Sequence, residues 1–209
     1  IDPIIFDAGN LFFKKNILDP GIALETAKIQ AEVIVDSFNK IGCEAFSPGE
    51  NDFAAGLNFL NALYSRSNFD YISCNIYNKS TNKPLFAPYK IINYYNCKIG
   101  VIGLASFFES KEVKILDPFD MLNKTLESIK GKTDFNILLF NANDQDLLSL
   151  YNHDLNIDII MRSGSRTKSN DGGNDIPTFS AGDRGKYLYK FNLEIGDKDY
   201  PLVDIGWCN

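Results

Sequence analysis

Histidine is scarce in this protein, which limits the chemistry that its polar side chains could perform. The only histidine, His153, falls between a segment with a helical apolar pattern and an apolar strand-like segment. A histidine at such a place is typical of a turn or a surface position. Chemistry that requires several imidazole groups, such as a multi-histidine metal centre, is therefore excluded for these residues.

The cysteines do not form a recognisable metal or redox motif. There are four, at positions that match no CxxC spacing: Cys43, Cys74, Cys97 and Cys208. We expect them to be small buried core residues. A disulfide or a thiol function is the alternative interpretation.

Charge and hydropathy argue against two classes of partner, nucleic acid and a membrane crossed by the chain. The formal net charge of the 209 residues is −6, and lysines and arginines are scattered without a basic stripe, so nucleic-acid binding is not expected. No stretch reaches the roughly eighteen apolar residues of a membrane span. The aromatic content of 13%, with ten tyrosines, is compatible with a protein-binding surface and equally with an aromatic core.

Helical and strand-like patterns alternate along the sequence, which predicts a layered α/β domain. One long helix is expected from Gly21 to Ile41, where apolar residues recur with helical spacing and Gly42 suits its end. The polar run from Ser163 to Asp175 is predicted to be a loop. Further helices are expected on the faces marked by Phe53–Tyr64, Phe119–Ile129 and Asp144–Tyr151, and strands at 4–6, 45–47, 71–74, 85–95, 98–104, 136–140, 157–161, 178–181, 187–195 and 202–205.

Three segments resemble one family of enzymes. The segments Cys74–Phe86, Lys98–Leu104 and Ala181–Leu188 are similar to the scaffold of bacterial 5′-nucleotidase/UDP-sugar hydrolases, which are calcineurin-like metallophosphoesterases. The resemblance implies an α/β fold, a four-layer α/β/β/α sandwich of two mixed sheets, over residues 1–209 as a single domain. It also implies an extracytoplasmic setting. We expect the family's C-terminal nucleoside-binding domain to be lacking, and the family's first metal motif would precede Ile1.

The same resemblance implies that the metal-binding motifs are broken. The family uses two divalent metal ions, held by aspartate, asparagine and histidine, to generate a hydroxide nucleophile. The bridging aspartate corresponds to Asn10, the ligating asparagine to Glu50, the assisting histidine to Asn51 and a further histidine to Asn141. The last two histidines correspond to Gly164 and Arg166. We therefore predict no catalytic residue and no metal cofactor.

Several interpretations of this vestigial cleft remain open. Arg166 is expected to replace the metal charge and to pair with Glu50. Alternatively, oxygens of Asn10, Glu50 and Asn141 could hold a weakly bound Ca²⁺ or Mg²⁺. Arg162 and Arg166 could bind an anion, or be solvated surface charges.

Two aspartates near these motifs are expected to have structural roles and not to bind a ligand. Asp7 and Asp52 are expected to form hydrogen bonds within loops, for example as helix caps.

The leading functional hypothesis is a catalytically inactive binding or assembly module with an unidentified protein partner. A divergent metal-dependent phosphohydrolase or 5′-nucleotidase is the first alternative. A nucleotide or phosphate sensor that does not hydrolyse its ligand is the second.

Overall fold

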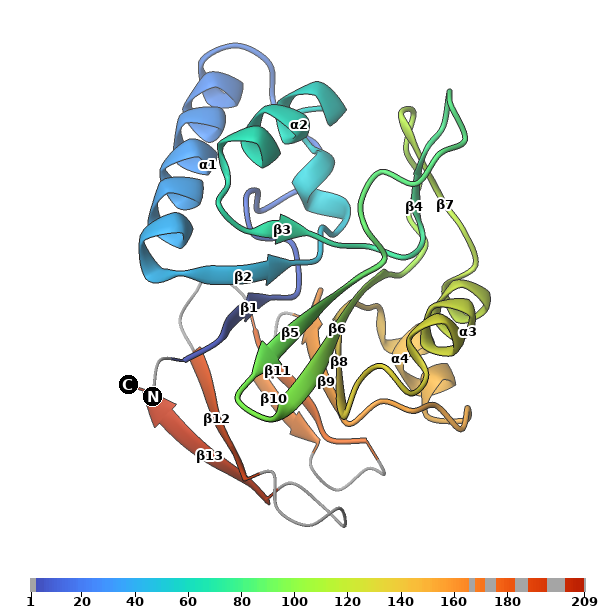
Figure 1. Ribbon diagram of the computed structural model, residues 1–209. Coiled ribbons are helices and arrows are strands. Elements are labelled where there is room, and N and C mark those ends of the chain that lie inside the picture. The colour runs from blue at the N-terminus through green and yellow to red at the C-terminus, as the bar shows by residue number, and fades with distance from the viewer. Residues whose placement is uncertain (1–2, 166–167, 172–175, 183–187, 195–201, 209) are drawn as a thin grey trace.

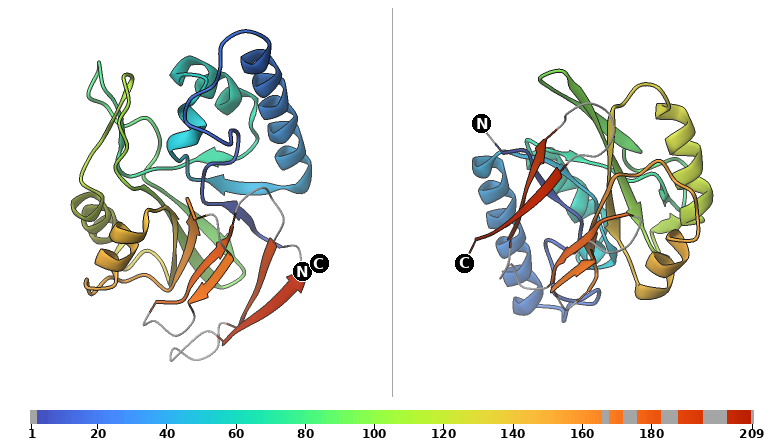
Figure 2. Two further views of the ribbon diagram at one scale, coloured as in Figure 1. Left: turned by 180° about the vertical axis from the view of Figure 1, so that it is seen from behind. Right: turned by 90° about the horizontal axis from the view of Figure 1, so that it is seen from below.

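The computed structural model describes residues 3–165, 168–171, 176–182, 188–194 and 202–208. Two sheets lie face to face, with helices on both outer sides (Figure 1). Helices α1 (Ile22–Ile41) and α2 (Leu57–Arg66) cover one side, and α3 (Pro118–Ile129) and α4 (Asp144–Leu150) cover the other (Figure 2). The predicted four-layer α/β arrangement is therefore confirmed.

The larger sheet is mixed, as predicted, whereas the smaller one is parallel and not mixed as predicted, because helical crossovers join its three described strands. The smaller sheet has the order β1–β2–β3, with β1 Ile5–Asp7, β2 Cys43–Phe46 and β3 Asp70–Tyr71. The larger sheet has the order β10–β11–β9–β8–β6–β5, with parallel pairing from β11 to β6 and antiparallel pairing at both edges. Its strands are β5 Tyr89–Tyr94, β6 Cys97–Ala105, β8 Phe135–Asn141, β9 Ile159–Ser163, β10 Lys168–Asp171 and β11 Thr178–Ala181.

Two further strand pairs complete the described elements. A ribbon is formed by β4 (Ile76–Asn78) and β7 (Val113–Ile115), and a hairpin by β12 (Leu188–Glu194) and β13 (Leu202–Cys208). Neither strand of the β4–β7 ribbon was expected from the sequence. Three-residue strands leave too little alternation for a pattern to be recognised.

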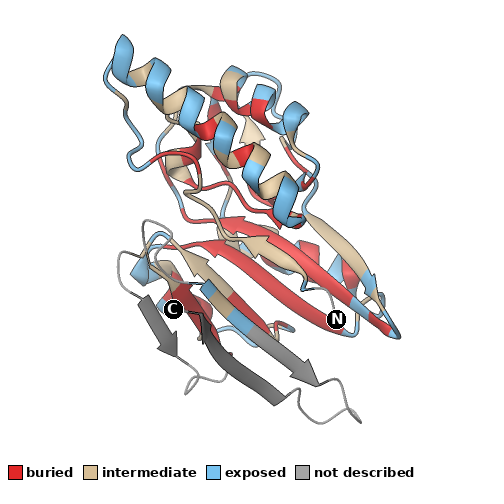
Figure 3. Ribbon diagram, turned by 90° about the vertical axis from the view of Figure 1, so that its left-hand side faces the viewer, coloured by how far each residue is buried: buried red, intermediate tan, exposed pale blue. Residues whose placement is uncertain are grey.

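The middle of the molecule is buried on both faces, as Figure 3 shows for the central strands. In β8, Ile137 and Leu139 pack between the two sheets with Ala45 and Ile72, whereas Leu138 packs toward α3 and α4. Because successive residues of a strand point to opposite faces, a strand covered on both sides needs a continuous apolar sequence. This requirement explains the uninterrupted run Ile137–Phe140.

The outer helical layer packs through a different cluster. Ala31 and Val35 of α1 and Leu60 and Leu63 of α2 are buried against the aromatic side chain of Phe46 and its neighbours. Helix α1 ends at Gly42, whose φ of 76° is the left-handed conformation that glycine adopts without a steric penalty. The predicted helix and its stop are confirmed.

Three details of the sequence-based assignment were wrong. Lys168–Asp171, inside the predicted polar loop, forms edge strand β10, because backbone pairing with β11 does not require apolar side chains at a sheet edge. Ile41, expected on the buried face of α1, is 54% exposed because it is the last residue of the helix. Phe53 lies in a separate 3₁₀ turn, η1 (Glu50–Phe53), and not in α2.

No helix among the described residues is long and apolar enough to cross a membrane.

Candidate functional site

Four loops meet at the carboxyl ends of the parallel strands, and two glycines show how closely. A Cβ on Gly9, after β1, would lie 2.5 Å from the carbonyl oxygen of Ser47 and 3.2 Å from Oγ of Ser163. A Cβ on Gly49, after β2, would lie 2.5 Å from Nδ2 of Asn141 and 2.7 Å from Oδ1 of Asn10. Only glycine fits such contacts. The loops after β1, β2, β8 and β9 therefore converge, and we call this group the cleft loops.

Asp52 ties the first two cleft loops together. Its carboxylate accepts backbone N–H groups from Asn10 at 2.8 Å, Phe12 at 2.9 Å and Gly49 at 2.8 Å. Burial raises the pKa of Asp52 to about 6, although these N–H donors lower it. The expected capping role is confirmed, because Gly49 is the residue at the start of η1.

Asp7 is the second buried carboxyl group here. Its Oδ1 accepts the N–H of Gly9 at 2.8 Å, as expected for a loop hydrogen bond. Burial raises the pKa of Asp7 to about 7; the Gly9 N–H lowers it and the charge of Asp52 raises it. Near neutral pH Asp7 is therefore partly protonated.

Asn10 has a left-handed backbone conformation, and a hydrogen bond holds its side chain. Its φ is 57°, in the left-handed region that asparagine tolerates better than most residues. Its Oδ1 accepts the backbone N–H of Asn51 at 3.0 Å. The amide oxygen of Asn10 is thus engaged within the protein, and Nδ2 is the end of the amide left for other partners.

Asn141 is oriented by a series of hydrogen bonds. The hydroxyl of Ser163 donates to the carbonyl oxygen of Ala8 at 2.5 Å, so its oxygen is free to accept. Nδ2 of Asn141 donates to that oxygen at 2.8 Å. The Asn141 side chain is buried, with 7% of the residue exposed. Its Oδ1 is the end that remains.

Glu50 has a partner that the sequence did not suggest. Its Oε1 accepts Nδ2 of Asn16 at 2.7 Å, from the segment between β1 and α1. Arg166, the predicted partner of Glu50, lies outside the described residues, so that pairing stays a prediction. Gly164 lies in this group with φ of 86°, and a Cβ there would lie 3.0 Å from the carbonyl oxygen of Ala142.

Arg162 is held within the protein. Its Nε and one terminal nitrogen donate to the carbonyl oxygen of Ala142 at 3.2 and 3.0 Å, and the same terminal nitrogen pairs with Asp144. The side chain is only 8% exposed. The alternative of a solvated surface charge is therefore wrong for Arg162, and these contacts favour a structural role over anion binding, which stays a prediction.

The remaining candidates lie away from the cleft loops. His153 is exposed in the turn after α4, where its ring stacks on Phe119 with 5.0 Å between centroids. Cys43, Cys74 and Cys97 are free and buried, as expected, whereas the side chain of Cys208 lies outside the described residues. Burial raises the pKa of Cys43 and of Cys74 to about 12, so neither is a reactive thiolate.

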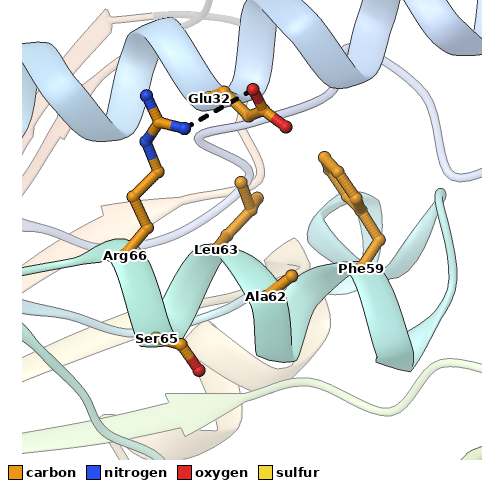
Figure 4. Close-up of a pocket in the computed structure, with 6 residues that line it drawn as sticks. All are labelled: Glu32, Phe59, Ala62, Leu63, Ser65 and Arg66. Carbon is orange, nitrogen blue, oxygen red and sulfur yellow. Dashed lines mark ion pairs between the residues drawn. The ribbon is translucent and has the colours of Figure 1, made fainter.

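A separate surface pocket lies between α1 and α2 (Figure 4). Arg66 pairs there with Glu32 at 3.6 Å and with Asp36 at 2.5 Å. These ion pairs join the two helices of the outer layer, and the pocket holds no group from the cleft loops.

The donor set of the cleft loops does not fit two metal ions. Of the positions that correspond to family ligands, Asn10 and Asn141 are neutral amides, and Glu50 supplies the one carboxylate. Within the described part of the protein, no group of three or more His, Cys, Asp and Glu side chains could hold a metal ion.

Sequence reasoning found most of this group but missed Asn16 and Ser163. Both are polar residues in polar surroundings, and their partners are distant in sequence, so no local signal distinguishes them.

Curated relatives match parts of the chain. A 5′-nucleotidase of Vibrio cholerae is 33% identical over 110 residues, which are 49% of this chain and 20% of that protein. A 5′-nucleotidase of Vibrio parahaemolyticus is 40% identical over 76 residues, and protein UshA of Escherichia coli is 34% identical over 76 residues; each match covers 36% of this chain and 14% of the relative. The chain thus spans a fifth or less of these relatives. No model of a known protein family matches it.

Solved structures match nearly the whole chain. A 5′-nucleotidase precursor of Thermus thermophilus superposes with a TM-score of 0.77 at 18% identity, covering 99% of this chain and 45% of that one. The calcineurin-like phosphoesterase YfkN of Bacillus subtilis superposes with a TM-score of 0.73 at 19% identity, covering 97% of this chain and 74% of that one. The predicted resemblance is therefore confirmed: this chain is a relative of the 5′-nucleotidase/UshA proteins and has the calcineurin-like phosphoesterase fold.

Proposed function

We propose that this protein is a catalytically inactive member of its family that acts as a binding or assembly module. The observation that carries the proposal is the orientation of Asn10. Because its Oδ1 accepts the N–H of Asn51, the end left for a ligand is an NH₂ group. An NH₂ group carries hydrogen-bonding protons and cannot coordinate a cation.

The neighbouring positions support the same conclusion. Asn141 is neutral, and Glu50 is already hydrogen-bonded to Asn16. Two adjacent divalent cations need several negative ligands to offset their mutual repulsion. One carboxylate and two amides are insufficient, and the same shortage argues against the weak Ca²⁺ or Mg²⁺ site.

The names of the relatives favour a second candidate, a divergent metal-dependent phosphohydrolase. Several of them are called 5′-nucleotidase. The matched segment is only a small part of each relative, so their activity is not transferred to this protein. The extracytoplasmic location and the protein partner also stay predictions.

Metal stoichiometry and turnover, measured together, test the proposal. The purified protein is incubated with Mn²⁺, Zn²⁺ or Ca²⁺, and bound metal is quantified after removal of free ions. Hydrolysis of p-nitrophenyl phosphate and of a nucleoside 5′-monophosphate is then followed with each ion. We expect no stoichiometric metal and no turnover above the protein-free rate. Stoichiometric metal with turnover that Asn51→Ala abolishes, while the surface variant Asn82→Ala retains it, would overturn the proposal.

A further inference from the structure

The surface pocket between α1 and α2 holds charged and apolar groups that the proposed function does not use (Figure 4). Its volume is about 360 Å³, at the lower end of the roughly 300–1,000 Å³ that small-molecule sites occupy. Glu32 comes from α1, and the other lining residues come from α2: Phe59, Ala62, Leu63, Ser65 and Arg66. The pocket therefore suits a small ligand that contacts both helices.

Asp36 holds the guanidinium of Arg66 in a fixed orientation. Nε and Nη2 of Arg66 donate to the two carboxylate oxygens of Asp36 at 2.8 and 2.5 Å. A two-point contact of this kind fixes the plane of the guanidinium. The third nitrogen, Nη1, donates no hydrogen bond within the described part of the chain and lies 3.6 Å from Oε2 of Glu32. The pocket thus contains a cationic donor that is already in place for a ligand.

Glu32 supplies a carboxylate beside this donor. It accepts no hydrogen bond from a described residue, because its contact with Nη1 of Arg66 is too long to be one. The side chains of Glu32 and Arg66 are 43% and 47% exposed, and an ion pair so exposed to solvent contributes little to stability. A ligand that brings one charge within hydrogen-bonding distance of each group therefore loses little by replacing their mutual contact.

The rest of the pocket is apolar. In Figure 4 the ring of Phe59 stands at the opposite end of the pocket from Arg66, Leu63 and Ala62 lie between them, and Ser65 points away. Apolar atoms of a ligand that cover this floor are removed from water, which favours binding. The ligand should therefore carry charge at one end only and have an apolar body.

The charges favour a ligand that has one charge of each sign. A simple anion would meet the carboxylate of Glu32, and a simple cation would meet the guanidinium of Arg66. Lys28, one turn before Glu32, is paired with Glu25 at 2.9 Å and adds no net charge. In an α-amino acid the nitrogen and the nearer carboxylate oxygen are joined through two carbon atoms and lie about 3 Å apart, close to the 3.6 Å between Nη1 and Oε2.

We propose that the pocket between α1 and α2 binds a free α-amino acid with an apolar side chain. The carboxylate of the ligand accepts from Nη1 of Arg66, its ammonium group donates to Glu32, and its side chain covers Leu63 and Phe59. This site lies outside the cleft loops and does not depend on the proposed function.

Titration with phenylalanine and with leucine tests the site, followed by two-dimensional NMR of the backbone amide groups. We expect saturable shifts that cluster at Glu32 and at Phe59–Arg66. N-acetylphenylalanine lacks the ammonium group, and phenylalaninamide lacks the carboxylate. Each should bind at least tenfold more weakly than phenylalanine, because it loses one charge-assisted hydrogen bond and leaves one charge of the pocket unmatched.

Two pairs of variants separate the site from the rest of the surface. Glu32→Gln should weaken phenylalanine binding at least tenfold, whereas Glu127→Gln, which opens the exposed ion pair with Lys130, should leave it unchanged. Ala62→Leu fills the pocket and should abolish binding. Asn61→Leu adds the same side chain to the same helix outside the lining and should not. Ala62 and Asn61 are both exposed, so both variants should fold, which melting curves check.

Three results would each overturn the proposal. They are the absence of saturable binding by either amino acid, binding of N-acetylphenylalanine or phenylalaninamide as tight as that of phenylalanine, and undiminished binding by Glu32→Gln or Ala62→Leu. None of these measurements involves metal ions or phosphoester hydrolysis, so this site and the proposed function can fail separately.

Discussion

The side-chain oxygen of Asn10 accepts the backbone N–H of Asn51 at 3.0 Å, which joins the loop after β1 to the turn after β2. These two residues stand where the family resemblance implies a bridging aspartate and an assisting histidine. This hydrogen bond joins the two loops directly, within the protein. The contacts around this pair, and those of the supporting layers, lead to expectations that mutation can test.

Restoring an aspartate at position 10 should destabilise the protein and not create a metal site. Asn10→Asp places a third carboxyl group beside Asp7 and Asp52, both of which are buried. We expect a loss of about 1–2 kcal/mol in the free energy of unfolding at pH 8, measured by denaturant titration. The loss should shrink at pH 5. Asn82→Asp, at another left-handed and exposed position, should cost less at either pH, and a stabilised Asn10→Asp variant would contradict the prediction.

The protein should become more stable as the pH falls from 8 to 5. Burial raises the pKa of Asp7 to about 7 and that of Asp52 to about 6, above the ordinary value of 3.8. The folded state therefore binds these protons more tightly than the unfolded state, and acidification through this range favours folding. Asp7→Asn should raise the melting temperature at pH 8 and flatten its pH dependence. Asp154→Asn, in an exposed turn, serves as the control, and an unchanged pH profile in Asp7→Asn would refute this account.

Lys90 should contribute to holding the two sheets together. From edge strand β5, its Nζ lies 2.9 Å from Glu44 of β2 and 3.0 Å from Asp70 of β3. We expect Lys90→Met to lower the free energy of unfolding by about 1 kcal/mol at low salt, and less at high salt because ions screen the pairs. Lys130→Met removes a surface-exposed pair with Glu127 and should change stability little. Equal effects of the two variants would show that the contacts of Lys90 with the smaller sheet do not contribute to the free energy of unfolding.

Glu112 should stabilise the start of α2. It lies just before β7, and its Oε2 accepts the N–H of Leu57 at 2.9 Å, where Gly56 offers no side-chain cap. We expect Glu112→Ala to cost about 1 kcal/mol and to speed amide hydrogen exchange in the first turn of α2 more than elsewhere. Glu109→Ala, in the same exposed segment, is the matched control. Unaltered exchange at Leu57–Leu60 in Glu112→Ala would count against this role.

The sequence by itself determined the layered fold and the composition of the candidate site. The alternation of apolar patterns defines helices and doubly buried strands such as β8, because periodicity follows from backbone geometry alone. The neutral or altered side chains at positions 10, 50, 51 and 141 are likewise visible without a structure.

Only the tertiary structure decided how those side chains are used. The direction of each amide depends on partners distant in sequence, 41 residues between Asn10 and Asn51 and 155 between Ser163 and Ala8. Periodicity carries no information about such pairs. Glu50 accepts a hydrogen bond from Asn16, 34 residues away in sequence, and its predicted pairing with Arg166 lies outside the described residues. The oxygen of Asn10, which one interpretation of the sequence assigned to a weakly bound cation, is engaged by Asn51, and Nδ2 is the other end of the amide. This orientation is a consequence of loop packing, and the residue types alone do not reveal it.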